Sequence, residues 1–327
     1  MNKKVVLLFG IIVLVAVAFW VRNRKTGPTQ SQTRYLMDTY CTITVPGPPE
    51  VLPAIEAAFA RIEEIDRKFS ALESDSPLYA FNRFNKPIVD EEIVSLVGRA
   101  LRVSEQSAGA FDITVYPLVE AWGFYGDTPA LPDNARIGRI LPAVGYEHLA
   151  VEDGKLTKNG THVQIDLGSI AKGYAVGEAL RALKQKGIQS ALIDAGGDIY
   201  ALGTIHGKPW KIGIRNPRGE GNIGALELSD MAIVTSGDYE RYFEREGIRY
   251  HHILDPRTGY PARGLASVTV ISPDPTLADA WSTALFVMGR EDGREAMEKV
   301  SGIETLMVTT GGEKFFTSGM NVTVQNK

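Results

Sequence analysis

Residues 277–285 read LADAWSTAL and place a carboxylate close to two hydroxyl groups. If this segment is helical, Ser282 and Thr283 follow Asp279 by three and four positions, so the three side chains share one face. Such oxygen ligands suit magnesium, a hard cation that keeps several waters and bridges to substrate phosphates. The same pattern fits an acid that the dipole favours in the first turn of a helix. The segment alone therefore leaves a metal site and a solvated acid as alternatives.

Residues 165–173 read IDLGSIAKG, which indicates a strand ending at Asp166, a glycine, and a helix that begins within a few residues. The first turn of that helix holds Lys172, where the helix dipole disfavours a cation. Helix N-termini offer free N–H groups that bind phosphate, and a local anion would remove the unfavourable interaction. We therefore predict an anion beside Lys172, with a phosphate as the first candidate and an exposed surface lysine as the alternative.

Two further segments combine acidic residues with glycine or histidine. Residues 194–198 (DAGGD) put a glycine pair directly after an apolar strand, where the backbone can approach a ligand or form an ordinary tight turn. Residues 250–261 (YHHILDPRTGYP) place His251 and His252 on opposite faces of a strand, so at most one points into a given site. This spacing does not make a zinc site. One histidine could act as a general base, or both could be structural.

The spacing of apolar residues predicts the elements that would hold these groups. Spacings of three and four predict helices over residues 51–69, 93–104, 170–186, 277–288 and 294–300. β-rich runs predict strands at residues 40–45, 190–194, 210–215, 233–235, 250–254 and 267–271, and a hairpin of residues 305–309 and 314–317. Because strands and helices alternate without a regular βαβ order, we predict an α+β fold of mixed sheets with packed helices. The chain contains neither a P-loop nor the dinucleotide fingerprint.

Composition excludes several classes of protein. The 327 residues are 44% hydrophobic and 23% charged, which is typical of a folded globular chain. The net charge is −4, and beyond residues 1–25 the chain has 30 basic against 39 acidic residues. A body this acidic, without a long basic run, argues against nucleic acid as a partner. The single cysteine, Cys41, excludes an internal disulfide and a cysteine-rich zinc site, and we expect it to be buried on a strand.

The N-terminus carries a membrane signal. An apolar run covers residues 5–21, with Lys3 and Lys4 before it and three basic residues within the next four positions. A helix of this length spans about 25 Å, the short end of what crosses a bilayer. Residues 16–18 (AVA) resemble a cleavage site, but the apolar run continues beyond them, so we predict an uncleaved signal anchor over residues 1–25 rather than a signal peptide. Residues 26–34 are predicted to be a polar linker.

Taken together, these segments resemble the ApbE family, the FAD:protein FMN transferases. The motifs follow the order of that family at residues 37–39 (MDT), 109–115 (GAFDITV), 122–124 (WGF), 165–173 (IDLGSIAKG), 194–198 (DAGGD), 235–239 (TSGDY), 252–259 (HILDPRTG) and 278–283 (ADAWST). The resemblance implies one ApbE-like, T-fold-like domain over residues 35–327. Two features depart from the family pattern: Asp38 stands where glycine is more usual, and the lipobox cysteine of many exported members is absent.

The resemblance also implies roles for individual residues. Magnesium would be held by Asp279 and Thr283, with Ser169 contributing its backbone oxygen and Ser282 a further position. The residues assigned to FAD are Met37, Leu72, Ala110, Phe111, Asp112, Asp166, Lys172 and Ile253. His252 and Asp279 are the candidate general bases.

The implied reaction joins FMN to a threonine or serine hydroxyl of a partner protein and releases AMP from FAD. The partner would carry a Gly-Ala-Ser/Thr motif and belong to a sodium-pumping NADH:quinone or Rnf-type complex. The implied enzyme would sit in the inner membrane with its catalytic domain facing the periplasm or the cell exterior.

Three alternatives stay open from the residues. They are a magnesium-dependent FAD pyrophosphatase that yields FMN and AMP, a non-catalytic exported FAD-binding protein, and a flavoprotein that carries the flavin itself. The last is disfavoured because the closest acceptor-like run, residues 108–111 (AGAF), ends without a hydroxyl.

Overall fold

The computed structural model describes residues 27–126, 128–320 and 323–324 of the chain. The predicted signal anchor over residues 1–25 lies outside these described residues. Among the helices that are described, none combines the length and the apolar character that a membrane crossing requires.

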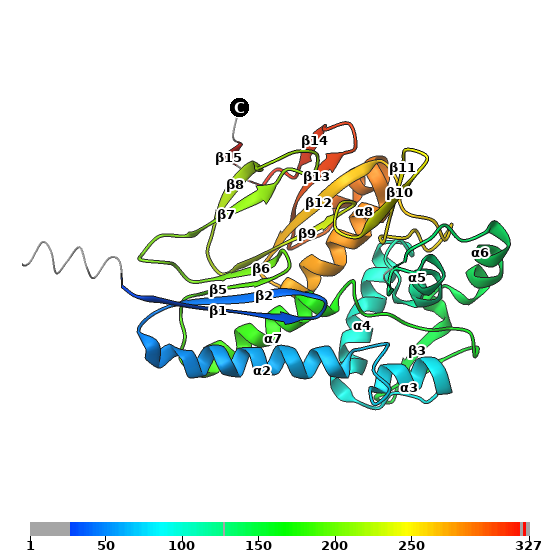
Figure 1. Cartoon of the computed structure of the whole chain (residues 1–327), viewed down its shortest axis with the longest axis horizontal. Helices are drawn as coiled ribbons and strands as arrows, with labels where there is room; N and C mark the ends of the chain where they lie inside the picture. Colours follow the sequence, from blue (N-terminus) through cyan, green and yellow to red (C-terminus); the bar gives the residue numbers. More distant parts are fainter. Residues whose placement is uncertain (1–26, 127, 321–322, 325–327) are drawn as a thin grey trace, which may run out of the picture.

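An eight-stranded sheet forms the centre of the fold, and all neighbouring strands in it are antiparallel (Figure 1). Its strands, in spatial order, are β1 (Thr29–Leu36), β2 (Thr39–Pro46), β5 (Ala191–Ala195), β6 (Asp198–Leu202), β9 (Met231–Gly237), β12 (Leu265–Ser272), β13 (Glu304–Thr309) and β14 (Lys314–Phe316). Segments far apart in the sequence therefore become neighbours, above all where β2 pairs with β5 and β9 pairs with β12.

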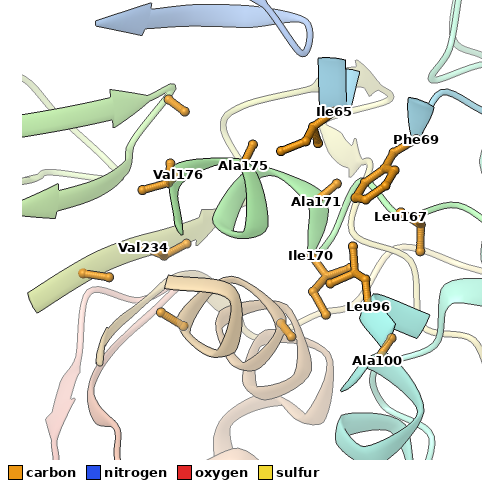
Figure 2. Close-up of a cluster of buried hydrophobic side chains, with 14 of the residues drawn as sticks. Ile65, Phe69, Leu96, Ala100, Leu167, Ile170, Ala171, Ala175, Val176 and Val234 are labelled. Atoms are coloured by element: carbon orange, nitrogen blue, oxygen red, sulfur yellow. The ribbon is translucent and has the colours of Figure 1, made fainter. Parts of the chain in front are cut away.

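Four longer helices pack around this sheet. They are α2 (Leu52–Lys68), α4 (Glu91–Gln106), α7 (Ala171–Gln185) and α8 (Pro275–Met297). Figure 1 shows α2 and α7 running along one face of the sheet. The main core lies where these elements meet: Ile65 of α2, Leu96 of α4, Ala175 of α7 and Val234 of β9 belong to one buried apolar cluster (Figure 2). This core holds the N-terminal ends of α7 and α8 in place.

A second core covers the opposite face of the sheet. There β7 (Trp210–Arg215) and β8 (Asn222–Leu228) form a smaller sheet with β15 (Thr323–Val324). Ile212 and Leu226 from this layer pack with Ile233 of β9, whereas the next residue, Val234, belongs to the main core. Because successive residues of a strand point to opposite faces, β9 contributes to both cores.

A third group of elements stands beside the sheet. It consists of α3 (Pro77–Phe84), α5 (Tyr116–Trp122), α6 (Asn134–Ile140), the ribbons β3 (Leu149–Glu152)–β4 (Lys155–Lys158) and β10 (Tyr242–Arg245)–β11 (Ile248–His251), and the 3-10 turns η2 (Ile113–Val115), η3 (Leu141–Ala143) and η4 (Tyr146–His148). A further 3-10 turn, η1 (Pro49–Val51), leads directly into α2. Trp122 packs against Leu118 and Phe124 in a small core of its own, and its Nε1–H donates to the carbonyl oxygen of Gly259.

The structure confirms the predicted α+β class. The helices predicted over residues 51–69, 93–104 and 170–186 correspond to α2, α4 and α7. The predicted terminal hairpin is β13–β14, and the strand predicted at residues 210–215 is β7. Cys41 is buried on β2, as its residue type suggests.

Three predicted boundaries need correction. Residues 29–34 are not linker: they belong to β1, whose polar side chains pair with β2 through contacts such as Ser31 Oγ to Thr44 Oγ1 at 2.9 Å. The strand predicted at residues 250–254 ends at His251. The helices predicted over residues 277–288 and 294–300 are two arms of α8, which bends at Gly289 with φ 78° and ψ −164°.

Candidate active site

α7 and α8 meet at their N-terminal ends because Gly173 has no side chain. A Cβ atom at this position would lie 2.3 Å from the carbonyl oxygen of Pro275 and 2.6 Å from Cβ of Asp279. The close approach lets the N–H of Gly173 donate to Oδ2 of Asp279 at 2.8 Å. Asp279 is 3% exposed in this junction. It is therefore a fixed, buried carboxylate and not a solvated acid at a helix surface.

Lys172 lies beside an anion, as its place in the first turn of α7 predicts, but that anion belongs to the chain. Its Nζ donates to Oδ2 of Asp198 at 2.8 Å, and Asp198 is 2% exposed. The carboxyl group of Asp198 also hydrogen-bonds to that of Asp279. Lys172 is thus not a free surface lysine. The three side chains form one hydrogen-bonded unit, called the charge cluster below.

The charge cluster holds two acids in one buried space. Burial and the neighbouring Asp198 charge raise the pKa of Asp279 to about 7, and burial raises the pKa of Asp198 as well. Burial alone would lower the pKa of Lys172, but Asp198 and Asp279 hold it above its usual range. Two carboxyls with raised pKa values beside one cation form a site that an additional positive charge would stabilise.

A tight turn sets the position of Asp198. Oδ1 of Asp194 accepts a hydrogen bond from the N–H of Gly197 at 2.9 Å, which closes the turn between β5 and β6. Gly196 has a φ of +64°, and a Cβ on it would lie 2.2 Å from Oγ1 of Thr39. The glycine pair thus forms the tight turn that was one of its two predicted roles, and Gly196 also lets the β1–β2 hairpin approach closely.

Three hydroxyl groups border Asp279. Ser282 Oγ donates to the carbonyl oxygen of Asp279 at 2.8 Å and lies 2.7 Å from Ser236 Oγ. Ser236 Oγ is also 3.3 Å from Thr283 Oγ1. Ser236 comes from β9, whereas the other two residues are one turn further along α8 than Asp279. The predicted helical face is therefore present, and a strand completes it with a third hydroxyl.

The donor set fits a hard cation. Its atoms are oxygens of Asp279, Ser282, Thr283 and Ser236, and magnesium prefers such ligands. Within the described ranges, no group of three or more His, Cys, Asp and Glu residues gathers where a metal could bind, so a zinc-type site is absent from them. Ser169 lies in the turn that leads into α7, with its backbone two residues before the start of that helix.

The two histidines have different surroundings. His251 is 3% exposed, contacts the ring of Phe286 edge-on at 5.4 Å, and forms a hydrogen bond from Nε2 to the carbonyl oxygen of Ala262 at 2.9 Å. His252 faces the other way, toward the ring of Phe124. The predicted alternation is correct, and His251 is the structural member of the pair.

The β1–β2 hairpin reaches the same region. Met37 and Asp38 both have positive φ values, 54° and 58°, at its tip. The N–H of Met37 donates to Oδ2 of Asp66 at 2.9 Å, and Oδ2 of Asp38 lies 3.6 Å from the guanidinium of Arg241. Aspartate tolerates the left-handed conformation better than most residues, so Asp38 can replace a glycine here.

Comparisons with known proteins establish the family of this chain. A model of the ApbE family matches residues 37–307. The chain belongs to the ApbE family. It is 35% identical to the FAD:protein FMN transferase of Treponema pallidum over 85% of this chain and 84% of that protein. The fold matches the crystal structure of the ApbE protein of Thermotoga maritima, at 38% identity and a TM-score of 0.84, over 89% of this chain and 97% of that one. The apo form of the Pseudomonas stutzeri flavinyl transferase ApbE matches at 34% identity and a TM-score of 0.79, over 89% and 95%.

The residues of this chain that the resemblance to the ApbE family assigns to FAD differ in the solvent exposure of their side chains. The side chains of Ala110, Phe111 and Asp112 are buried, and Oδ1 of Asp112 accepts hydrogen bonds from the backbone N–H and hydroxyl of Thr114. This segment can therefore offer a ligand its backbone more readily than its side chains. It is joined to the next assigned residue by a hydrogen bond from the N–H of Asp166 to the carbonyl oxygen of Ile113.

Asp166 itself is half-buried and faces the phenol of Tyr125. Burial raises its pKa, while Tyr125, two backbone amides and the charge of Arg241 act against that rise. Ile253 is buried directly after His252. Leu72 is 52% exposed in the loop after α2, and no contact in the described structure connects it to the charge cluster. Its assignment to FAD stays a prediction.

Sequence reasoning missed three residues of this ApbE site. Asp198 is part of the DAGGD motif and Ser236 part of TSGDY, but neither motif shows which side chain points to Asp279. Arg241 follows the second motif and lies near His252 and Asp38. Only Asp198 could have been expected from the sequence, because Lys172 in the first turn of a helix requires an anion beside it. Ser236 and Arg241 gave no comparable signal.

Proposed function

We propose that this protein transfers the FMN half of FAD to a threonine or serine hydroxyl of a partner protein and releases AMP. The observation that carries the proposal is the charge cluster of Lys172, Asp198 and Asp279 beside the hydroxyls of Ser282 and Thr283. Membership of the ApbE family and relatives named FAD:protein FMN transferase support it.

Magnesium is the metal we propose for this site. Asp279 and Thr283 would hold it, with Ser282 and the backbone oxygen of Ser169 as further ligands. When bound, magnesium neutralises charge on the pyrophosphate and on the leaving phosphate. Lys172 and the positive end of the α7 dipole add positive potential on the same side.

The transfer exchanges one phosphorus–oxygen bond for another. The acceptor oxygen forms a bond to the phosphorus on the FMN side, and the bond from that phosphorus to the bridging oxygen breaks. AMP leaves with the bridging oxygen and the bonding electrons, and the proton of the acceptor hydroxyl passes to a base. Met37, the backbone of residues 110–112, Asp166 and Ile253 are proposed to orient FAD for this step.

We propose His252 as the group that accepts that proton. Its Nδ1 lies 3.3 Å from the carbonyl oxygen of Arg241, which can only accept, so Nδ1 carries the hydrogen and Nε2 is left as an acceptor. Burial and the nearby charge of Arg241 hold the pKa of His252 well below its usual range, so the ring is neutral at physiological pH. The carboxyl of Asp279, in contrast, is already engaged by Gly173 and Asp198.

The test is incubation of the protein with FAD, magnesium and an acceptor that carries a Gly-Ala-Thr motif, followed by intact-mass analysis of the acceptor. We expect a mass increase of one FMN on the threonine and none when the threonine is alanine. Asp279→Ala should abolish the adduct, whereas Asp274→Asn, which keeps a cap on the same helix, should not. Free FMN without an adduct would instead identify a pyrophosphatase, and FAD binding without turnover a flavin-binding protein.

The cellular setting is also proposed. We infer that residues 1–25 anchor the protein in the inner membrane, with the folded domain facing the periplasm or the cell exterior. Acceptor subunits of sodium-pumping NADH:quinone or Rnf-type complexes are the partners we propose there.

A further inference from the structure

Arg241 stands beside the proposed base, His252. It lies between β9 and β10, and its carbonyl oxygen accepts from the backbone N–H of His252 at 3.0 Å and contacts the imidazole Nδ1 of that residue. The backbone of Arg241 is therefore tied to the histidine. Its side chain is 45% exposed.

The guanidinium faces the site with little compensation. Among the described residues, the only carboxylate within 4 Å of it is that of Asp38, at 3.6 Å. After burial, the positive charge of Arg241 is the next largest cause of the lowered pKa of His252, and the same charge opposes the protonated forms of Asp166 and Lys172. Arg241 thus adds positive potential beside His252 and Asp166, in addition to that of Lys172.

Asp38 presents its carboxylate from a fixed tip. The N–H of Met37 is held by Asp66, and the N–H of Gly196 donates to the carbonyl oxygen of Tyr40 at 3.2 Å. The ion pair itself is exposed, with 70% of the Asp38 side chain and 45% of the Arg241 side chain accessible to solvent. Exposed pairs of this kind contribute little free energy, so a better anion can replace the carboxylate.

A phosphate is such an anion. Arginine forms paired hydrogen bonds with phosphate oxygens, and these charge-assisted bonds are stronger than a single long contact to a solvated carboxylate. FAD brings two phosphates to a site whose metal-binding side is on α8. The guanidinium of Arg241 lies beside His252, held within the described part of the chain only by a long, exposed contact to Asp38, and is therefore available to a phosphate.

We propose that Arg241 binds a phosphate of FAD, and that Asp38 holds the guanidinium at the mouth of the site until FAD replaces it. This inference rests on the proposed function, because it assumes FAD as the substrate. In this proposal Asp38, which stands where glycine is more usual, competes with the phosphate of FAD for the guanidinium of Arg241. Removal of its charge should therefore improve FAD binding, the opposite of what loss of a ligand contact would do.

The experiment measures equilibrium binding by quenching of flavin fluorescence, with the full chain and magnesium present. FAD is compared with riboflavin, which has the same ring system and no phosphate. Arg241→Gln should weaken FAD binding about tenfold to a hundredfold, and Arg241→Lys less, because lysine keeps the charge without the paired geometry. Riboflavin binding should change less than about twofold in both variants.

Asp38→Asn supplies the second arm. Asparagine keeps the size of the side chain and tolerates the positive φ, so the hairpin tip is preserved. We expect FAD to bind about twofold to fivefold more tightly, with no further change when Asp38→Asn is added to Arg241→Gln.

Three results would overturn the proposal. They are unchanged FAD affinity in Arg241→Gln, equal losses for FAD and riboflavin, and weaker or unchanged FAD binding in Asp38→Asn with Arg241 present. These binding results do not depend on group transfer. A missing acceptor adduct together with the expected binding pattern would count against the proposed function alone.

Discussion

At the scale of single residues, Lys172 shows how a cation becomes part of a buried structure. Its partner Asp198 is 2% exposed, so Lys172→Ala leaves a carboxylate without its cation in a buried space. We expect the variant to lose about 2–3 kcal/mol of unfolding free energy, less than for a fully buried pair because the Lys172 side chain is 31% exposed. Urea denaturation without FAD measures this, and Lys172→Ala with Asp198→Asn should recover part of the loss. An unchanged midpoint for Lys172→Ala would show that water already satisfies Asp198.

This expectation differs from the one that the first turn of a helix suggests. The dipole rule alone predicts that alanine would stabilise the start of α7. Because Lys172 pairs with Asp198, we instead expect Lys172→Ala to destabilise the protein. The pattern IDLGSIAKG predicts that Lys172 needs an anion, but it does not specify whether the anion is a ligand or another segment of the chain.

His251 gives a residue-scale prediction of pH dependence. Burial lowers its pKa to about 4, whereas an exposed histidine titrates near 6.5. Below pH 6.5 the unfolded chain takes up a proton that the folded His251 does not accept, so stability falls as the pH drops from 6.5 toward 4. We expect this residue to account for about 2 kcal/mol of lost stability between pH 7 and pH 5. Between pH 7 and pH 5, the unfolding free energy of His251→Gln should fall by about 2 kcal/mol less than that of the unmodified chain, as measured by urea denaturation. An equal fall in both proteins would show that His251 is not the source of the pH dependence.

At the scale of elements, the junction of α7 and α8 decides whether the site forms. Gly173→Ala would put a methyl group 2.3 Å from a backbone oxygen of α8, so the two helix starts must separate and Asp279 must move. We expect a loss of about 3 kcal/mol in stability together with loss of turnover.

Gly98→Ala is the matched control for this substitution. It also lies in a helix, but the nearest atom to its Cβ is Nη1 of Arg102 at 3.9 Å. It should stabilise the protein by about 0.5–1 kcal/mol and leave turnover unchanged. Equal effects of the two substitutions would mean that helix propensity, and not the contact with α8, determines the result at Gly173.

Elements also show what sequence patterns can and cannot predict. The apolar stripe of Ile55, Phe59, Ile62 and Ile65 predicts α2 because all four side chains face the core. The polar residues 29–34 of β1 resemble a linker in the sequence because an edge strand with one exposed face can consist of Thr, Ser and Gln and bury little. Its register is set by hydrogen bonds to β2, which leave no apolar pattern in the sequence.

At the scale of the whole molecule, the site depends on topology. Asp198 lies on β6, Ser236 on β9, Lys172 on α7 and Asp279 on α8. These elements are distant in the sequence: Gly173 and Asp279, which are hydrogen-bonded, are more than a hundred residues apart. Motif order identified the family and most of these segments. The side-chain partners follow from strand order, which no single segment encodes.

A truncation series tests the boundary of the folded domain. β1 pairs with β2 along its whole length, from Thr29 opposite Pro46 to Leu36 opposite Thr39. A chain that begins at Gly27 should therefore fold and bind FAD like the full chain. A chain that begins at Leu36 exposes the edge of β2 and frees the hairpin tip, and we expect its Tm to fall by about 5 °C or more with weaker FAD binding. Equal Tm values for the two shortened chains would show that β1 is dispensable.

The central claim is that the acceptor hydroxyl, and not water, attacks FAD. The direct measurement is the ratio of AMP released to FMN bound covalently, in one reaction with FAD, magnesium and an acceptor carrying the Gly-Ala-Thr motif. We predict one AMP for each FMN on the acceptor threonine, and little AMP when that threonine is alanine. AMP release at the same rate with the alanine acceptor, accompanied by free FMN, would contradict the claim.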